Sequence, residues 1–372
     1  MNPTEKPVGI DLADAVVLGQ QAIVGAGAFV ALAAAADLAG PWAIPAVAVA
    51  GVLAAATGLS LVRDPSLVEP SSARVAETAA LAAAAGVLAC AAAAYLAPDS
   101  GGLAGRCIPA ALILAVGALR VAFGRLSRPA AGVFLALTMG GLAFFVGSAL
   151  PLLKLSAFPP APGRPVVGAM AACGLLALAF SGFGHLVARR HELEPGYTAR
   201  NAVLLAVLPL AVIYILVVLG GFGVVLTARP MLYGASGALV AGGGTWQTSG
   251  FAPLVLAAAW TYHPAVRWAV RLAAVAACGG GLYTLLGDAS GEPVQPARLG
   301  GVGLAAAALT LIVPAGGLLR LAALAVLARH AIVHGLDAQR GSRASAALAA
   351  MYIVLFGALA WSSVGSSMAR GW

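Results

Sequence analysis

Two hydrophobic stretches of this 372-residue chain contain paired glycines, and they are its strongest candidates for chemistry. One stretch holds Gly25-Ala26-Gly27, and the other holds Gly182-Phe183-Gly184. Glycine in a helix interior costs about 1 kcal/mol relative to alanine. It also permits local unwinding, and in a bilayer the freed N–H and C=O groups are tolerated only where they line a cavity or are buried in protein. Both stretches are therefore candidate binding segments.

Freed backbone groups of this kind select a ligand by charge. The N–H groups of a half-helix favour a carboxylate, and free carbonyls favour an ammonium, so a zwitterionic amino acid satisfies both. Interrupted helices at matching places in two halves of a chain indicate an inverted-repeat transporter. The alternative is that the small residues only pack helices together. The chain has 47 glycines, so such pairs also arise by chance.

Three polar residues near the glycine pairs are candidates for lining a cavity. Gln20 and Gln21 precede the first pair by about one turn, and each could face a cavity or bond to a neighbouring helix. His185 follows the second pair. It could carry a proton, because imidazole titrates near neutral pH, or it could be a helix-end histidine bonded to a neighbour. His330 and His334 have the spacing of a zinc pair, but no third ligand is apparent and no metal site is predicted.

The composition requires these segments to lie in a membrane. Hydrophobic residues make up 61% of the chain and charged residues 9%, whereas soluble domains carry roughly 25% charged residues. That excludes an ordinary soluble enzyme, a disordered scaffold and a coiled coil. Spans of about 20 apolar residues are predicted near residues 13–37, 41–62, 75–97, 107–126, 130–153, 166–188, 200–227, 266–286, 299–316, 318–337 and 345–363.

The spans predict an all-α integral membrane protein with about eleven transmembrane helices in a single membrane domain, residues 1–372. We expect a five-plus-five inverted repeat in which helices one and six are broken. The first repeat would cover residues 10–153, the second residues 166–337, and residues 345–363 would form an additional C-terminal helix. Spans nine and ten could also form one kinked unit around Pro314.

The charges predict an orientation and a location. The net charge is +8, but the basic residues are scattered between apolar runs, so nucleic-acid binding is not expected. More of them fall on one face if the N-terminus is cytoplasmic, which is therefore the predicted orientation. The excess of alanine, and of arginine over lysine, is typical of GC-rich bacterial genomes. We therefore expect a multi-pass protein of the bacterial plasma (inner) membrane.

Several motifs are similar to those of one transporter family. The run Ile23-Val24-Gly25-Ala26-Gly27-Ala28-Phe29-Val30 resembles the first-helix signature of the amino acid–polyamine–organocation (APC) superfamily. Ala39-Gly40-Pro41 is similar to the start of that family's second helix, and Phe180-Ser181-Gly182-Phe183 is similar to a motif of its sixth helix. The resemblance covers about residues 10–62 and 175–227.

The resemblance implies a broken-helix fold that works by alternating access. It implies that the backbone of residues 25–27 contacts a substrate carboxylate and that the carbonyls of residues 180–182 contact an ammonium. Phe183 would be a candidate aromatic gate. The partners would be the lipid bilayer, a small-molecule substrate (an amino acid or related amine) and a coupling ion that the sequence does not identify.

We therefore expect a secondary permease for an amino acid or amine, with no cofactor and no catalytic residue. The alternative is a degenerate permease-like protein with a structural, sensor or subunit role. Gly184 stands where the family often has Glu, and Gly141 lies near the place of the lysine that proton-coupled members can carry. An intramembrane enzyme would need Asp14, Arg120 and His185 to converge. No P-loop, HExxH motif or nucleophile elbow supports that third reading.

Overall fold

The chain folds almost entirely into helices. The structure is a computed structural model, and it describes residues 10–64, 71–97, 102–124, 126–153, 165–193, 197–232, 254, 258, 261, 263–290 and 295–368. Within these residues the only extended pairing is an isolated bridge between Ile10 and Leu193. The prediction of an all-α protein is confirmed.

The first half of the chain contributes α1 to α6. The helical segments are α1 (Leu12–Ala26), the π-helix η1 (Gly27–Ala31), α2 (Leu32–Ala39), the short 3₁₀ turn η2 (Gly40–Trp42), α3 (Ala43–Arg63), α4 (Ser71–Leu96), α5 (Gly102–Phe123), α6 (Arg128–Ala149) and the 3₁₀ turn η4 (Leu150–Leu152).

The second half contributes the remaining helices. They are α7 (Pro165–Phe180), α8 (Phe183–Ala188), the 3₁₀ turn η6 (Arg190–Glu192), α9 (Tyr197–Leu232), α11 (Pro264–Ser290), α12 (Pro296–Ile312), α13 (Ala315–Gln339) and α14 (Arg343–Met368).

The helices are roughly consistent with the predicted number of membrane spans. In the described residues, eight segments are long and apolar enough to cross a membrane, and the first of them, Leu12–Arg63, contains two of the predicted spans. The shorter apolar helices α7 and α12 supply two more. Spans nine and ten are separate helices, because Val313 and Pro314 lie between α12 and α13 and proline cannot continue an α-helix. The division into two inverted repeats stays a prediction.

Helix ends follow local chemistry. The carboxylate of Asp11 accepts a 2.8 Å bond from the Asp14 N–H and caps α1, as short polar side chains do at helix N-termini. Gly40 has a φ of 57° where α2 gives way to α3, and Gly124 and Gly341 have φ values of 68° and 96° just after α5 and α13. These are left-handed conformations that glycine adopts without strain.

Helix one of the prediction corresponds to α1, η1 and α2, and its interruption differs from the expected unwinding. The chain stays helical from Leu12 to Ala39, and Gly27–Ala31 form one π-helical turn between α1 and α2. A π-helical turn widens the helix locally and is frequent at functional sites. Helix one is therefore interrupted in its regular geometry, but its backbone does not unwind at Gly25 or Gly27.

Helix six of the prediction corresponds to α7 and α8, and it is broken where the sequence predicted. Helix α7 ends at Phe180 and α8 begins at Phe183, with a turn at Ser181-Gly182. The carbonyls of Ser181 and Gly182 accept bonds of 3.1 Å from the N–H groups three residues further on. The break is therefore tight, and its backbone groups are bonded within the chain.

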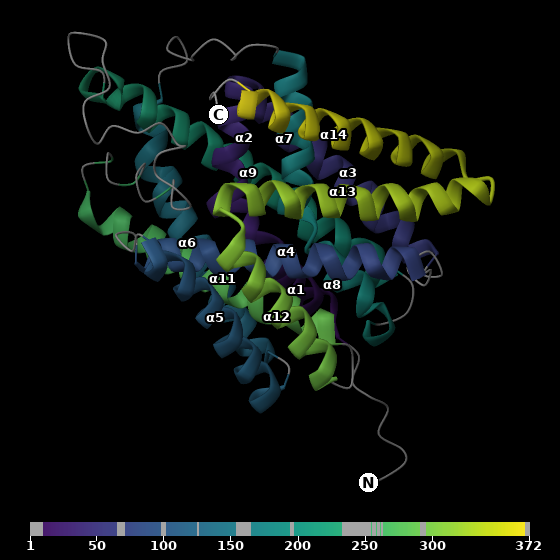
Figure 1. Cartoon of the computed structure of the whole chain (residues 1–372). Coiled ribbons are helices and arrows are strands. Elements are labelled where there is room, and N and C mark those ends of the chain that lie inside the picture. The colour runs from purple at the N-terminus through teal and green to yellow at the C-terminus, as the bar shows by residue number, and fades with distance from the viewer. Residues whose placement is uncertain are drawn as a thin grey trace.

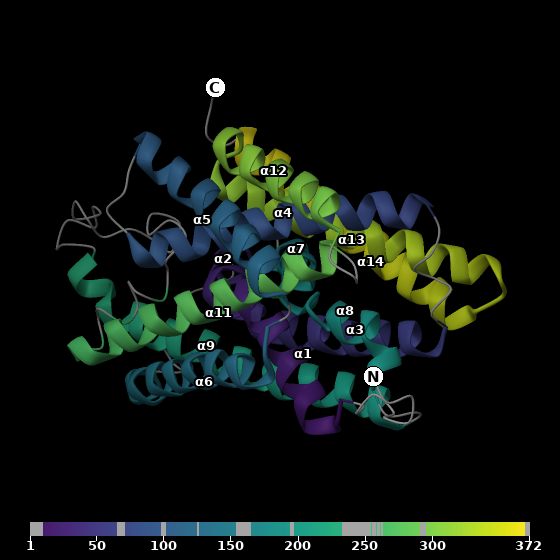
Figure 2. The ribbon, with the colours of Figure 1, turned by 90° about the horizontal axis from the view of Figure 1, so that it is seen from below.

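Helix α1 packs against α6, α9 and α11 (Figures 1 and 2). Helices α4, α13 and α14 run side by side in both views, and α4 also packs against α11. Just before α1, the Ile10 N–H donates at 2.8 Å to the carbonyl of Glu192 in η6, the turn that follows the end of helix six. The ends of α3 and α13 meet through Asp64 and Arg340. We call the side where these four ends lie the N-terminal face.

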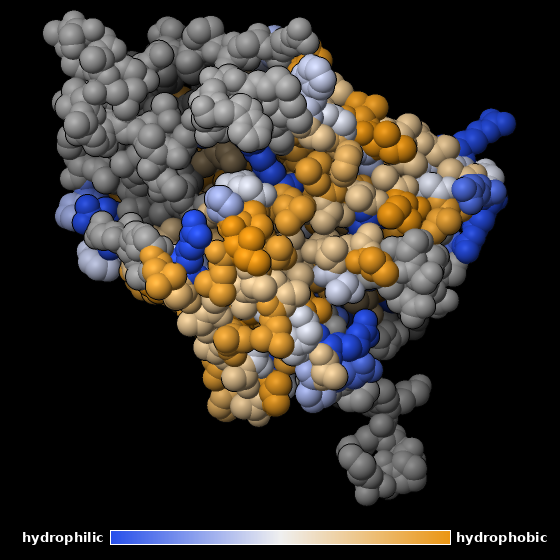
Figure 3. Space-filling model, in the orientation of Figure 1, coloured by the Kyte–Doolittle hydropathy of each residue, from blue (hydrophilic) through white to orange (hydrophobic). Residues whose placement is uncertain are grey.

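The outer surface of the bundle is broadly apolar. Figure 3 shows orange and tan side chains over most of the visible described surface, with blue ones gathered towards the edges. Large exposed apolar side chains include Phe123 on α5 at 76% and Ile312 on α12 at 75%. An apolar exposed surface of this extent indicates contact with lipid.

We predict that Gly182 and Gly184 differ sharply in their tolerance of a side chain. A methyl group at Gly182 would overlap the backbone carbonyl of Ala22 on α1, whereas no heavy atom lies within 4 Å of the same position at Gly184. Gly182→Ala should lower stability by about 1–3 kcal/mol, as overpacking does. Thermal unfolding of the purified variants in detergent measures the effect.

Gly184→Ala is the matched control and should unfold at or above the wild-type temperature, because alanine is the better helix former. Equal melting temperatures for the two variants would contradict the close approach of helix six to α1.

Candidate functional site

The predicted binding segments meet, but their meeting point is filled by protein. Gly182 lies against the backbone of Ala22, so helix six crosses α1 without an intervening side chain. A methyl group at Gly27 would overlap the hydroxyl of Tyr214 on α9, and one at Gly25 would lie 2.9 Å from Leu88 on α4. The two helices therefore cross at glycines, and other helices close the space around the crossing.

Carbonyls of helix one bond to side chains from other helices. The Tyr214 hydroxyl donates to the Ile23 carbonyl at 3.2 Å, and the Tyr95 hydroxyl donates to the Phe29 carbonyl at 3.0 Å. Cys278 Sγ contacts the Gly25 carbonyl at 3.4 Å. Buried polar groups need such partners in hydrocarbon. In this conformation the protein itself supplies them.

Aromatic rings also pack around the crossing. Phe29 meets Tyr95 edge-on, with ring centroids 5.7 Å apart, and Phe180 meets Tyr214 at 5.2 Å. Phe183 stacks on His330 of α13 at 5.8 Å and is fully buried. The predicted gate Phe183 is therefore held between helices in this state.

A cavity of about 130 Å³ lies beside the crossing. Helices α1, α4, α11 and α13 and the break in helix six each contribute to its walls. Its lining residues are Ala22, Ile23, Glu77, Ala80, Leu81, Ala84, Leu88, Leu178, Ser181, Gly182, Gly184, His185, Ala188, Gly281, Thr284, Leu285, Asp288, Val326 and Arg329.

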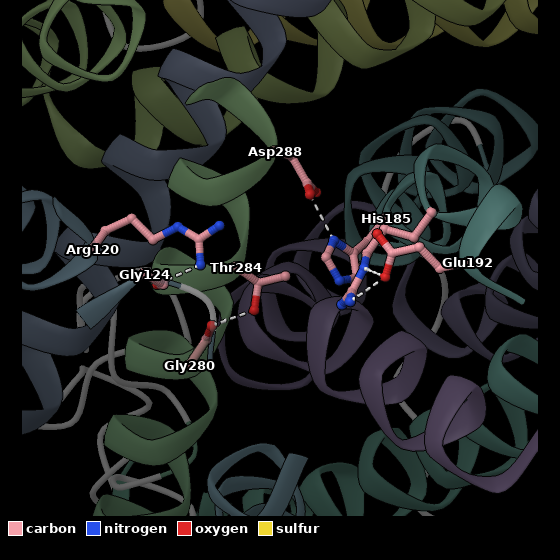
Figure 4. Close-up of polar contacts among 8 residues, drawn as sticks. Arg120, Gly124, His185, Glu192, Gly280, Thr284 and Asp288 are labelled. Atoms are coloured by element: carbon pink, nitrogen blue, oxygen red, sulfur yellow. Dashed lines mark hydrogen bonds and ion pairs between the residues drawn. The ribbon is translucent and has the colours of Figure 1, made fainter. Parts of the chain in front are cut away.

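Two pairs of ionisable side chains line this cavity. His185 Nδ1 lies 2.6 Å from a carboxylate oxygen of Asp288, so the pair joins α8 to α11 (Figure 4). The Arg329 guanidinium of α13 donates to Glu77 of α4 at 3.0 Å. Ionisable groups at membrane depth are costly and mark functional sites by default. The cavity, which we call the paired-charge cavity, is therefore the candidate site.

The structure brings some of the predicted site residues into this cavity. Ser181, Gly182 and His185 line it, whereas Gly25, Gly27, Phe180 and Phe183 do not. Ala26 is the last residue of α1. On helix one the lining residues are Ala22 and Ile23, one turn before the predicted segment. A ligand role for residues 25–27 stays a prediction.

The two glutamines face away from the cavity. Gln20 Nε2 donates to the Leu205 carbonyl of α9 at 3.1 Å, so Gln20 bonds to a neighbouring helix. Gln21 is 1% exposed and lies against Gly280 and Phe134. Within the described part of the chain, neither of its amide atoms has a hydrogen-bond partner.

Three charged residues of the cavity were not among the predicted site residues. Glu77, Asp288 and Arg329 come from three different helices, and none belongs to a motif. One signal was present, because Asp288 follows Thr284 and Gly281 at helical spacing and all three line the cavity. His185 lies 103 residues from Asp288 in the chain, and Glu77 lies 252 residues from Arg329. No local sequence pattern reveals pairs this far apart.

A second buried polar cluster lies between α3, α13 and α14. The Thr57 hydroxyl shares hydrogen bonds with the Tyr352 hydroxyl at 2.7 Å and His334 Nε2 at 3.3 Å, and His330 packs on the Tyr352 ring. In the described residues no group of three or more His, Cys, Asp or Glu side chains could hold a metal ion. The spacing of the two histidines serves packing and hydrogen bonding here.

The residues considered for an enzyme do not bond to one another. Arg120 donates to the Gly124 carbonyl at 2.7 Å and lies over the Tyr283 ring at 5.4 Å, while His185 pairs with Asp288 (Figure 4). Asp14 lies in the first turn of α1. Arg120 therefore secures the end of α5 against α11.

The fold can be compared with solved structures. The chain is similar to the crystal structure of MhsT in complex with L-phenylalanine, with 13% sequence identity and a TM-score of 0.44. The likeness covers 94% of this chain and 88% of that one. No family model and no curated protein matches the chain. The residues of the cavity must therefore carry any conclusion about function.

We predict that Gly27 and Tyr214 are energetically coupled. Gly27→Ala should destabilise the protein, because its methyl group meets the Tyr214 hydroxyl, at a cost of about 1–3 kcal/mol. Tyr214→Phe removes that hydroxyl and loses one hydrogen bond, worth about 1 kcal/mol. A double-mutant cycle of thermal stability tests the coupling.

The double variant should be more stable than the sum of the two losses implies, because the phenylalanine leaves room for the methyl group. Strictly additive losses would show that the ring of Tyr214 does not lie against Gly27.

Proposed function

We propose that this protein is a secondary transporter that binds a small zwitterionic amino acid, or a related amine, in the paired-charge cavity. The observation that carries the proposal is the placement of two acidic and two basic side chains around one cavity in a chain of apolar membrane helices. Net transport would follow alternating exposure of this cavity to the two sides of the membrane.

The charges of the cavity fit the two ends of such a ligand. Arg329 can bind a carboxylate in a bidentate manner, which the planar guanidinium favours. Glu77 and Asp288 supply carboxylates for an ammonium, and the hydroxyls of Ser181 and Thr284 line the same space. In the structure these charges pair with one another, so a ligand would insert between partners that already compensate each other.

The size of the cavity limits the ligand. Its volume of about 130 Å³ is close to that of an engineered cavity of about 150 Å³ that binds benzene. Benzene has as many non-hydrogen atoms as alanine. A ligand near the size of alanine is therefore favoured over one with a large side chain.

The location of the cavity supports a route to one side of the membrane. His185 lies on the short helix α8, and the turn η6 that follows helix six bonds to Ile10, just before α1, at the N-terminal face. Glu77 lies in the second turn of α4, and Asp288 lies in the last turn of α11, two residues before its end. The cavity therefore belongs to the half of the bundle nearest the N-terminal face. With the predicted orientation, this face would be cytoplasmic.

One observation favours the alternative of a permease-like protein without transport. The backbone of helix one is continuous through its π-helical turn, and aromatic side chains fill the crossing beside Gly27. A sensor or subunit could retain the ligand cavity while lacking the movement. It would bind the ligand but would not exchange it across a membrane.

We predict that purified protein in liposomes exchanges L-alanine and that Arg329→Gln weakens L-alanine binding about tenfold or more, the loss expected for one charge-assisted bond. The readouts are counterflow of labelled L-alanine and equilibrium binding. A panel of amino acids and short amines, assayed in the same way, ranks the ligands by size.

Arg340→Gln is the matched control, because Arg340 directly follows the helix of Arg329, pairs with Asp64 at the surface and lies outside the cavity. The double variant Glu77→Gln with Arg329→Gln tests whether the unpaired Glu77 carboxylate, rather than lost ligand contact, disturbs folding. Binding without counterflow would favour the non-transporting alternative. Absence of binding across the panel would contradict both.

A further inference from the structure

We propose that the pair His185–Asp288 is a proton-binding site and that a proton is the coupling ion of the transporter. This inference rests on the proposed function, and it concerns how the site is energised. The proton would bind at the His185 imidazole, travel with the substrate in the closed cavity, and leave to water when the cavity opens.

The geometry of the pair suits a shared proton. Nδ1 of His185 lies 2.6 Å from Asp288 Oδ1, and charge-assisted N–H···O bonds are typically about 2.7–2.9 Å long. With Nδ1 donating to the carboxylate, a second proton on Nε2 makes the ring a cation. The side chains are 10% and 26% exposed, so the pair is partly shielded from water while it remains in contact with the cavity.

Among the groups that line the cavity, a protonated His185 is the one that compensates the negative charge of Asp288. Across the cavity, Glu77 of α4 and Arg329 of α13 form their own ion pair. On the stretch that follows His185, Arg189 donates to Glu192 at 2.7 Å. In the described residues, the side chain that pairs with the Asp288 carboxylate is His185.

The other helices that touch α8 add apolar contacts. Leu186 of α8 packs against Gly19 of α1, and Phe183 packs near Gly58 of α3 and Val203 of α9. The charged groups that line the cavity around His185 are therefore Asp288, Glu77 and Arg329.

Charge balance links the proton to the substrate. Glu77 and Arg329 cancel, and a zwitterion adds no net charge. A closed cavity with its ligand is then left with the single negative charge of Asp288 unless His185 is protonated. An uncompensated charge is costly away from water. The loaded cavity should therefore bind the proton more tightly than the open one, and by reciprocity the proton should tighten ligand binding.

The test uses proteoliposomes that contain the full chain and L-alanine as the probe. Uptake is measured with an inward proton gradient, with an inward sodium gradient, and with neither. With an inward gradient of about one pH unit the wild type should accumulate L-alanine up to about tenfold, because one coupled proton supplies a tenfold concentration ratio per unit. His185→Gln and Asp288→Asn should each bring the ratio of driven to undriven uptake to about one, because each removes the shared proton.

Glu192→Gln is the matched control. It removes a nearby carboxylate that pairs with Arg189 and does not line the cavity, so its ratio should equal that of the wild type. A ratio in His185→Gln equal to that of the wild type would overturn the proposal, and so would accumulation driven by sodium alone. Failure of the wild type to exchange L-alanine or any panel member contradicts the proposed function instead.

A measurement on the empty protein keeps the two outcomes apart. Infrared difference spectra between an acidic and an alkaline buffer should contain a histidine contribution that is lost in His185→Gln, together with a carboxylate band that this variant shifts. An unchanged spectrum in that variant would overturn the proton site.

Discussion

The organisation of the site depends on the direct backbone contact between Gly182 of helix six and Ala22 on α1. Because a side chain at residue 182 would overlap the Ala22 carbonyl, only glycine allows the two helices to approach this closely. The contact holds the break of helix six beside Ala22 and Ile23. It also directs the short helix α8 so that His185 reaches Asp288 on α11. The cavity and its charges follow from this crossing.

Partial burial explains why the charges of the cavity come in pairs. An unpaired charge that is shielded from water is unstable, and the side chains of the two pairs are only 10–33% exposed. Arg329 and Glu77 join α13 to α4, while His185 and Asp288 join α8 to α11. The pairs therefore tie together the helices that surround the cavity. The same side chains can bind the ends of a zwitterion, because each one can exchange its partner for a ligand group with the same charge as that partner.

Hydropathy and glycine spacing predicted much of the architecture from the sequence. The apolar runs located the helices, and Gly182 located the break in helix six, because both depend on residues close together in the chain. The form of the interruption in helix one could not be predicted, because it depends on Tyr95 and Tyr214 bonding to its carbonyls from distant helices. The cavity could not be predicted for the same reason, since Asp288 and Glu77 meet their partners only in the folded bundle.

The most direct test of the cavity as a ligand chamber is the water accessibility of Ala84, a buried lining residue on α4. Cys107 is the one exposed cysteine among the described residues, so Ala84→Cys is made in a Cys107→Ser background. A membrane-impermeant thiol reagent is applied to vesicles from each side. The Ala84→Cys thiol should be modified from the N-terminal face, and more slowly with L-alanine present. A thiol that reacts from neither side, or one that L-alanine does not protect, would contradict the assignment of the cavity as a ligand chamber.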